Sequence, residues 1–262
     1  MKKKRVVVIA DFHCGHRVGL TPSKFATQTL GNKFYRTQVE LWAEYVKLAD
    51  RIKAEQKPDV LIVNGDCIDG RGERSGGTEL ITSSRHAQVE MAVECINIWE
   101  ARHIVLTRGT PYHTGTNDDY EDFIREGVKA DKIGDHEWIN VNGVIFDVKH
   151  KVGNTTIPHG KATPIAKERL WNYIWAEHEE QPKSDIIIRS HVHYAFYCGE
   201  PGSWLAMTTP ALQGQGSKFG ARQCSGTIHW GLVYFDIYEN GEYFWKPIIY
   251  RAESQKVVPL KF

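Results

Sequence analysis

The chain has 262 residues, of which 41% are hydrophobic and 25% charged, and its formal net charge is +1. This is the composition of an ordinary globular protein, and a charge near zero excludes a general electrostatic attraction to nucleic acid or to a membrane surface. No segment approaches the roughly 18 consecutive apolar residues of a membrane span. The five cysteines form no CxxC pair, and the basic start of the chain lacks the long apolar stretch of a secretory signal. We therefore expect a soluble, cytoplasmic protein.

The first half of the chain alternates short apolar runs with segments of helical periodicity. The predicted strands are 6–10, 60–63 and 104–106, and the predicted helices are 35–55, 84–101 and 118–129. Between them, residues 70–84 are rich in Gly, Arg and Ser and predict a loop. An alternation of this kind is typical of an α/β fold.

The second half is dominated by hairpin signals. Asn142-Gly143 separates two strand-like runs, and Asn240-Gly241 separates another two. A helix is predicted from Thr163 to about His178, and its periodicity indicates four inward-facing residues, which are Ile165, Leu170, Ile174 and, as a further candidate, Trp171. Strands are predicted at 185–188 and 194–198, whereas 199–226 has no clear period. We expect residues 1–262 to form a single domain with two sheets packed face to face and helices outside.

Acidic and imidazole side chains follow the ends of several predicted strands. They are Asp11, His13, Asp66, Asp69, His150, His191 and His193. Strand ends meet at one edge of a sheet, so residues far apart in the sequence can converge there. Within Asp-x-His and His-x-His, residues two apart on an extended segment point the same way. Carboxylate and imidazole groups bind divalent transition metals, and paired ions activate water and clamp phosphate. The pattern therefore predicts a hydrolase of phosphate esters.

With these motifs the chain resembles the calcineurin-like metallophosphoesterase superfamily. That family carries, in order, Asp-x-His, Gly-Asp-x-x-Asp, Gly-Asn-His, a strand-end His and Gly-His-x-His. The corresponding segments here are 11–13, 65–69, 108–113, 150 and 190–193. The resemblance implies a four-layer α/β/β/α sandwich of two mixed β-sheets flanked by helices, with two divalent metal ions at the strand ends.

The resemblance also implies a role for each residue. Asp11, His13 and His193 would hold one ion, His150 and His191 would hold the other, and Asp66 would bridge the two. Asp69 would orient one of the ligands. His159, in His159-Gly160, is the rival of His150, which is preferred because it ends a clear strand. Mixed His and Asp ligands suit manganese, iron, zinc or nickel, and we expect manganese.

The third motif departs from the family pattern. It reads Arg108-Gly109-Thr110-Pro111-Tyr112-His113, so that Thr110 stands in the position of the ligating Asn and the His is displaced by two residues. Three interpretations stay open. His113 is the acid that protonates the leaving oxygen, or it replaces the missing Asn as a metal ligand, or the second ion binds weakly and activity is low. We favour the first two. Arg108 is expected to contact the substrate phosphate as a bidentate fork.

Two segments with glycines and basic side chains are candidates for substrate contacts. The segments 70–85 and 199–226 are the predicted walls of the cleft, with Arg71, Arg74 and Arg85 as basic side chains toward the substrate. They suit a phosphodiester, in a nucleotide or nucleic acid, slightly better than a monoester. The alternative is a catalytically weakened protein of the same fold that binds a nucleotide or a protein partner. No obligate protein partner is expected.

Overall fold

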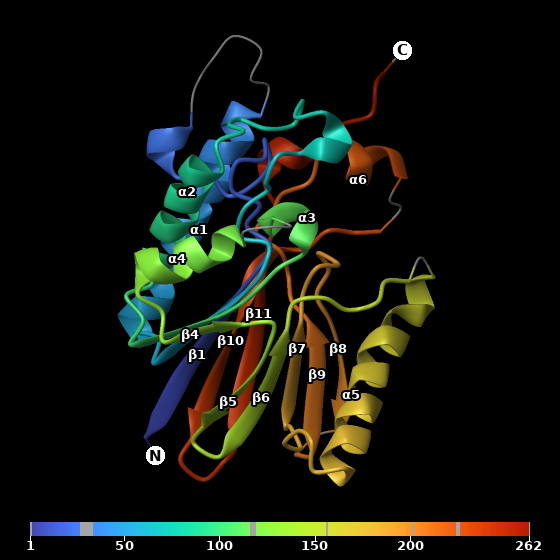
Figure 1. Ribbon diagram of the computed structural model, residues 1–262. Helices are drawn as coiled ribbons and strands as arrows, with labels where there is room; N and C mark the ends of the chain where they lie inside the picture. Colours follow the sequence, from blue (N-terminus) through green and yellow to red (C-terminus); the bar gives the residue numbers. More distant parts are fainter. Residues whose placement is uncertain are drawn as a thin grey trace.

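The computed structural model describes residues 2–26, 34–115, 119–155, 157–200, 202–223 and 226–261, with the side chains of Arg74, Phe219 and Gln223 outside that description. Its strands form two sheets (Figure 1). In spatial order, the first sheet consists of β11 (Tyr243–Tyr250), β10 (Trp230–Tyr238), β1 (Lys3–Ile9), β2 (Val60–Asn64), β3 (His103–Thr107) and β4 (Lys132–Gly134). The second consists of β5 (His136–Val141), β6 (Val144–Lys149), β7 (Ile186–Arg189), β9 (Trp204–Thr208) and β8 (Phe196–Glu200).

Both sheets are mixed. β1 runs parallel to β2 and antiparallel to β10, and β6 runs parallel to β7 and antiparallel to β5. The β5–β6 hairpin turns at Asn142-Gly143, as the sequence predicts. The long helices are α1 (Tyr35–Glu55), α2 (Arg85–Asn97), α4 (Tyr120–Val128) and α5 (Ala162–Glu177). The short helical segments are α3 (Pro111–Thr114), α6 (Lys218–Gln223) and the 3-10 turns Ser23–Phe25, Glu73–Ser75, Pro158–Lys161 and Glu253–Gln255.

The central strands separate two large apolar cores because their side chains alternate between faces. From β1, Val7 and Ile9 pack under α1, α2 and α4, whereas Val6 and Val8 pack against the second sheet. β1 and β2 are buried on both faces, which explains why each reads as a continuous apolar run. Under α5 lies a much smaller core, with Ile187 and Ala206 of the second sheet. The order of layers is α/β/β/α, and the predicted fold class is confirmed.

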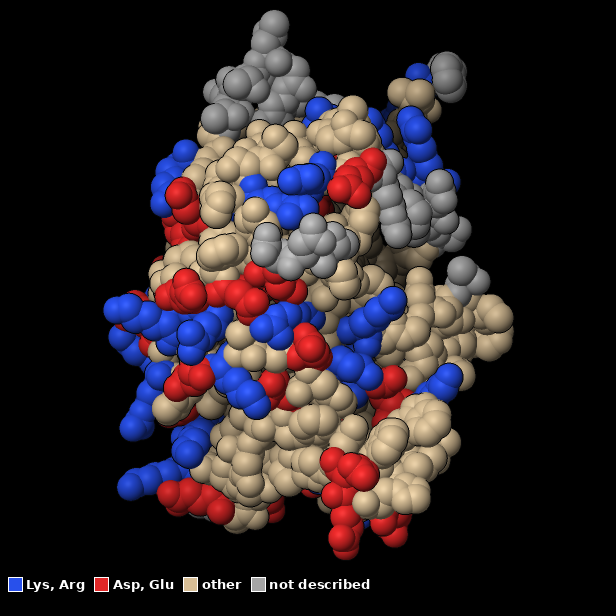
Figure 2. Space-filling view, viewed as in Figure 1, with Lys and Arg blue, Asp and Glu red and all other residues tan. Residues whose placement is uncertain are grey.

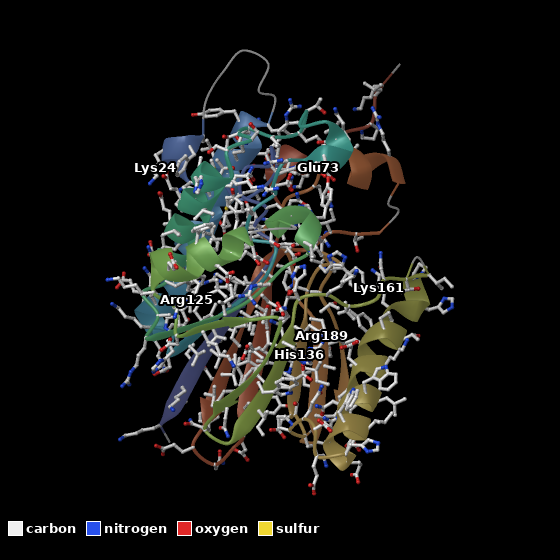
Figure 3. The ribbon with its side chains drawn as sticks, in the orientation of Figure 1. Lys24, Glu73, Arg125, His136, Lys161 and Arg189 are labelled. Atoms are coloured by element: carbon white, nitrogen blue, oxygen red, sulfur yellow. The ribbon has the colours of Figure 1, made fainter. Side chains whose placement is uncertain are left out.

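Of the four side chains that the sequence predicts to face inward from α5, only Ile165 is buried. Leu170, Trp171 and Ile174 are 59%, 47% and 37% exposed, so the expectation that they face inward is wrong. The reason is that the second sheet presents charge to this helix. Arg189 of β7 donates from Nε to Glu168 of α5 at 2.8 Å. Arg189 and His136, both labelled in Figure 3, also hydrogen-bond to the carboxylate of Asp147, at 2.7 Å each.

Two further elements differ from the sequence expectation. The segment 199–226, predicted to be irregular, contains β9 and α6. β9 lies between β7 and β8, and the backbone bonds of that central position impose the strand despite weak periodicity. The three-residue β4 was not predicted, and it adds to β3 at the edge of the first sheet.

The described surface has no field of a single sign on the face seen in Figure 2, where basic and acidic side chains are interspersed over most of the molecule. In the described part of the chain, none of the helices combines the length and apolar character that crossing a bilayer requires.

Candidate metal centre

The loops that follow β1 and β2 continue side by side beyond the strands. The amides of Asp11 and His13 donate to the carbonyls of Gly65 and Asp66, each at 3.0 Å. Asp11, His13 and Asp66 have left-handed φ angles of 54°, 47° and 51°. β1 ends at Ile9, before either residue. Asp11 and His13 do converge, but strand alternation, from which this was predicted, is not the cause. The left-handed backbone of these paired loops orients the two side chains. A left-handed conformation is strained for residues other than glycine, and it persists where many surrounding contacts hold it in place.

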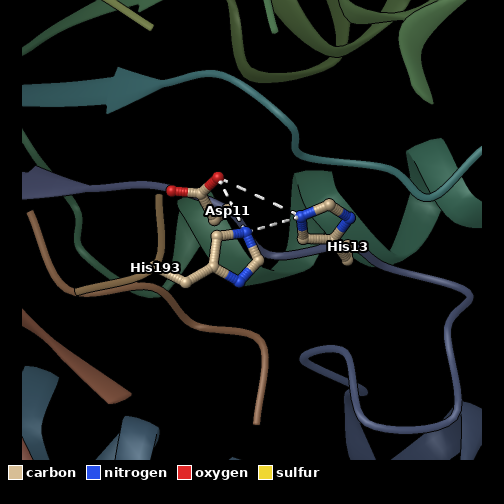
Figure 4. A group of neighbouring side chains, drawn as sticks. All are labelled: Asp11, His13 and His193. Atoms are coloured by element: carbon tan, nitrogen blue, oxygen red, sulfur yellow. Dashed lines mark hydrogen bonds and ion pairs between the residues drawn. The ribbon is translucent and has the colours of Figure 1, made fainter. Parts of the chain in front are cut away.

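The first cluster consists of Asp11, His13 and His193 (Figure 4). Oδ1 of Asp11 lies 3.3 Å from Nε2 of His193 and 4.0 Å from Nε2 of His13. The two Nε2 atoms are 3.3 Å apart. Asp11 and His13 are buried, whereas His193 is partly open. One oxygen and two nitrogens that converge in this way form a donor set suited to a divalent transition metal.

The second cluster consists of Asp66, His150 and His191. Oδ2 of Asp66 lies 3.0 Å from Nε2 of His150 and 3.9 Å from Nδ1 of His191. Nε2 of His150 is also 3.9 Å from Oδ1 of Asp11, so the two clusters adjoin. His150 directly follows β6, whereas its rival His159 is exposed in the Pro158–Lys161 turn.

Hydrogen bonds from the opposite ring nitrogen fix two of these histidines. Nδ1 of His150 lies 2.7 Å from the carbonyl of Asn64, and Nδ1 of His13 lies 3.0 Å from Oδ1 of Asp69. A carbonyl only accepts, so Nδ1 of His150 carries the proton. The lone pair of Nε2, when that nitrogen is unprotonated, then faces the cluster. Asp69 therefore lies behind the ring of His13, where its carboxylate can orient that ring.

The electrostatics of the two clusters follow from burial and from the neighbouring charges. Burial lowers the pKa of His13 well below its usual range, and the nearby His113 lowers it further. Burial also opposes charge on His150, but the adjacent Asp66 raises the pKa of His150 to about 10. Burial alone would raise the pKa of Asp66, but His150 keeps that pKa well below its ordinary value.

Two buried atoms of the clusters lack a hydrogen-bond partner. They are Oδ1 of Asp11 and Nε2 of His150, which make no hydrogen bond although they lie 3.3 Å from Nε2 of His193 and 3.0 Å from Oδ2 of Asp66, respectively. A buried polar atom without a partner loses its hydration at a cost of about 1–3 kcal/mol, so such atoms are rare unless something else satisfies them. Both atoms point into the clusters, and a divalent cation would satisfy both. The residues therefore fit a metal pair.

Thr110 contacts Asp66 rather than leaving its carboxylate free. Its amide and its hydroxyl donate to Oδ1 of Asp66, at 2.6 and 3.0 Å. This contact needs a residue without a side chain at position 109, because a Cβ there would collide with the amide and Oδ1 of Asp66. Thr110 therefore occupies the position of the family's Asn and orients the carboxylate of Asp66.

His113 reaches the first cluster despite its displacement in sequence. Its ring packs edge-on against that of His13, with centroids 4.5 Å apart. Nδ1 of His113 lies 3.1 Å from the carbonyl of Asp69 and therefore donates to it, which leaves Nε2 available. His13, Asp69 and His113 form a third group of converging ligand atoms.

The arginines predicted to face substrate are placed differently. The guanidinium of Arg108 is paired with Asp122 at 2.6 Å and Asp135 at 3.2 Å, so those carboxylates occupy the fork that was expected to hold phosphate. Arg85, at the start of α2, lies over the ring of Tyr120 at 4.8 Å. Within the described residues, no contact joins either arginine to the clusters. The side chain of Arg74 lies outside the described residues.

Glu121 is a buried residue of the site that the sequence interpretation missed. Its Oε1 accepts from the amide of Cys67 at 2.8 Å, and its Oε2 accepts from the amide of Gly109 at 2.6 Å. Burial raises the pKa of Glu121 to about 7. One carboxylate of α4 therefore ties the Asp66 loop to the Thr110 loop. A single Glu in the first turn of a predicted helix gives no sequence signal for this.

The sequence as a whole matches the family model described as calcineurin-like phosphoesterase over residues 4–202. The chain therefore belongs to this family, as its motifs predicted. No curated protein sequence matches it.

Several solved structures are similar in fold. Vps29 of Entamoeba histolytica complexed with Zn²⁺ is 14% identical, with 94% of this chain and 98% of that chain covered and a TM-score of 0.47. An archaeal phosphodiesterase is 12% identical, with 93% and 99% covered and a TM-score of 0.43. YfcE, a phosphoesterase from E. coli, is 10% identical, with 93% and 98% covered and a TM-score of 0.42.

Proposed function

We propose that this chain is a single-domain, metal-dependent hydrolase of phosphate esters. The observation that carries the proposal is the pair of adjoining clusters, in which Oδ1 of Asp11 and Nε2 of His150 are buried without a hydrogen-bond partner. Asp11, His13 and His193 would hold one divalent ion, and His150 and His191 would hold the other. Asp66, which contacts His150 and His191 of the second cluster, would bridge them.

The bound ions would supply a water of lowered pKa and neutralise charge on the phosphate. The protein's own groups do the rest. Asp69 and the carbonyl of Asn64 keep the rings of His13 and His150 oriented. His113, once protonated, donates from Nε2 to the leaving oxygen, a step typically worth about 10²–10⁴ in rate. Arg108 has no part in this scheme because aspartates occupy its guanidinium.

For the substrate we propose a phosphodiester, in a nucleotide or nucleic acid, in preference to a monoester, with manganese as the preferred ion. The support is the exposed Arg71 in segment 70–85 and the mixed donor set of the clusters. A second candidate function is that of a binding protein on the same fold. The observation that favours it is Thr110, which occupies the family's Asn position and directs its donors to Asp66 instead.

Hydrolysis of bis(p-nitrophenyl) phosphate and of p-nitrophenyl phosphate, with each divalent metal in turn, tests the proposal. We expect turnover of the diester with Mn²⁺, and a loss in Asp66→Asn larger than the roughly 100-fold that removal of an outer hydrogen-bond partner costs. His159→Ala is the matched control because His159 is exposed outside both clusters.

Metal analysis of the same preparations completes the experiment. Two ions per chain together with diester turnover support the hydrolase. Absence of turnover with every divalent ion, in a protein that still holds metal, would replace the hydrolase with the binding protein.

A further inference from the structure

The outward face of α5 carries a stripe of large apolar side chains. Leu170, Trp171, Ile174 and Trp175 are 59%, 47%, 37% and 42% exposed. Spacings of one, four and five residues place them together on one side of the helix. A cluster of exposed apolar side chains of this kind, with two tryptophans, marks an interaction surface in a soluble domain. We call these four residues the α5 stripe.

The stripe is not an inward face that has failed to pack. The other side of α5 is fixed to the protein by buried polar contacts. Arg169 is 5% exposed and donates to the carbonyl of Ser184, and Asn172 is 2% exposed and donates to the carbonyl of Pro182 at 3.0 Å. Glu168 receives Arg189 from the sheet below. Rotation of α5 to bury the stripe would break these hydrogen bonds. The buried polar contacts therefore keep the stripe on the outer side of the helix.

Charges at the two ends of the stripe have opposite sign. Lys167 is exposed at its amino-terminal end, whereas the ammonium of the preceding Lys161 lies over the ring of Tyr194. Glu177, Glu179 and Glu180 are exposed at its carboxyl-terminal end, and Figure 2 shows acidic side chains gathered around the lower end of α5. The stripe is therefore basic at its start and acidic at its end.

This arrangement is complementary to itself when reversed. Lys167 and Glu177 each lie five residues from Asn172, and Leu170 and Ile174 each lie two residues from it. A second α5 that runs antiparallel, with its Asn172 opposite the first, places each Lys167 near the partner's Glu177 and each Leu170 near the partner's Ile174. Antiparallel helices also oppose their dipoles favourably.

We propose that α5 is the dimer interface of this protein, with a second copy of the chain paired antiparallel across a two-fold axis. The interface is isologous and closed, as in most homodimers. The acidic end of the stripe disfavours the other apolar occupant, an anionic membrane surface, which repels exposed carboxylates.

Sedimentation equilibrium of the full chain, with its concentration varied over several decades, tests the proposal. We expect a dimer, and we expect Leu170→Glu and Trp175→Glu each to give a folded monomer with an unchanged circular dichroism spectrum and a melting temperature that no longer depends on protein concentration. Lys246→Glu, an exposed charge change on β11, is the control and should leave the dimer intact.

A charge exchange keeps the test independent of any folding defect. Lys167→Glu and Glu177→Lys should each raise the dimer Kd about tenfold, because each change puts like charges at two symmetric contacts. The double variant Lys167→Glu/Glu177→Lys should restore the dimer. A chain that is monomeric at every concentration overturns the proposal. So does a double variant as weak as the singles, or co-sedimentation of monomer with vesicles of anionic phospholipid through the same stripe.

Discussion

The two ligand clusters differ in what holds their histidines. In the first cluster, His13 is held by a side chain, the carboxylate of Asp69. In the second, His150 is held by the backbone carbonyl of Asn64. A side-chain anchor can be removed by one substitution, whereas a backbone anchor persists through any substitution that keeps the fold. The two clusters should therefore lose their ions separately.

The clusters also differ in the protons they carry. His13 has a pKa well below its usual range and is neutral at physiological pH, ready to donate a lone pair. His150 has its pKa raised to about 10 by Asp66, so the empty second cluster holds a proton that an ion must displace. Metal binding through His150 should therefore depend on pH much more strongly than metal binding through His13.

The largest effect is expected from His113, which touches only the first cluster. His113→Gln should lower kcat by about 10³-fold, within the range for a lost general acid, while the metal content stays at two ions. Initial-rate assays with the diester measure kcat, and metal analysis of the same variant measures the number of bound ions. A variant that loses one ion along with its activity would show that His113 is a ligand instead.

The pH dependence of metal binding separates the clusters directly. Below about pH 10, His150 is protonated in the empty site, so each unit rise in pH should increase affinity for the second ion about tenfold. From pH 7.5 to 9.5 we expect about 100-fold for the second ion and little change for the first. Calorimetric titration in buffers of different ionisation enthalpy measures the released proton. Equal pH dependence for binding of the first and the second ion would contradict the difference proposed between the two clusters.

Removal of the side-chain anchor should weaken the first cluster alone. Asp69→Ala frees Nδ1 of His13 and should lower affinity for the first ion by about tenfold, the lower end of the effect of such partners. The second ion should be retained, because His150 keeps its backbone partner. Competition with a chromophoric chelator measures both constants. Loss of the second ion first would mean that the clusters are coupled more tightly than their anchors indicate.

The smallest effect is expected at Thr110. Thr110→Asn supplies the amide oxygen that the family places beside the second ion, but it removes the hydroxyl bond to Asp66. We expect the gain to exceed the loss, with second-ion affinity increased about threefold and first-ion affinity unchanged. The same chelator assay decides. Weaker binding of the second ion would show that the hydrogen bond from the Thr110 hydroxyl to Asp66 contributes more to metal affinity than an additional ligand does.

The sequence by itself determined the fold class, and it singled out the Asp and His residues that the structure gathers into two clusters. Strands such as β1 and β2 are encoded locally, because burial on both faces requires an uninterrupted apolar run. The Asp and His residues that follow them are recognisable from their position after those runs. Hydrophobic periodicity and the order of the motifs were sufficient to predict features that depend only on residues close together in the chain.

Tertiary structure decided how those residues are aimed and what supports them. The left-handed backbone of Asp11 and Asp66, the tie between Glu121 and Gly109, and the outward stripe of α5 all depend on partners far away in the chain. Helical periodicity indicates which side of α5 is apolar, but not that a buried Arg189 would draw the polar side inward. Contacts of this kind follow from the packing of distant segments, and no local pattern records them.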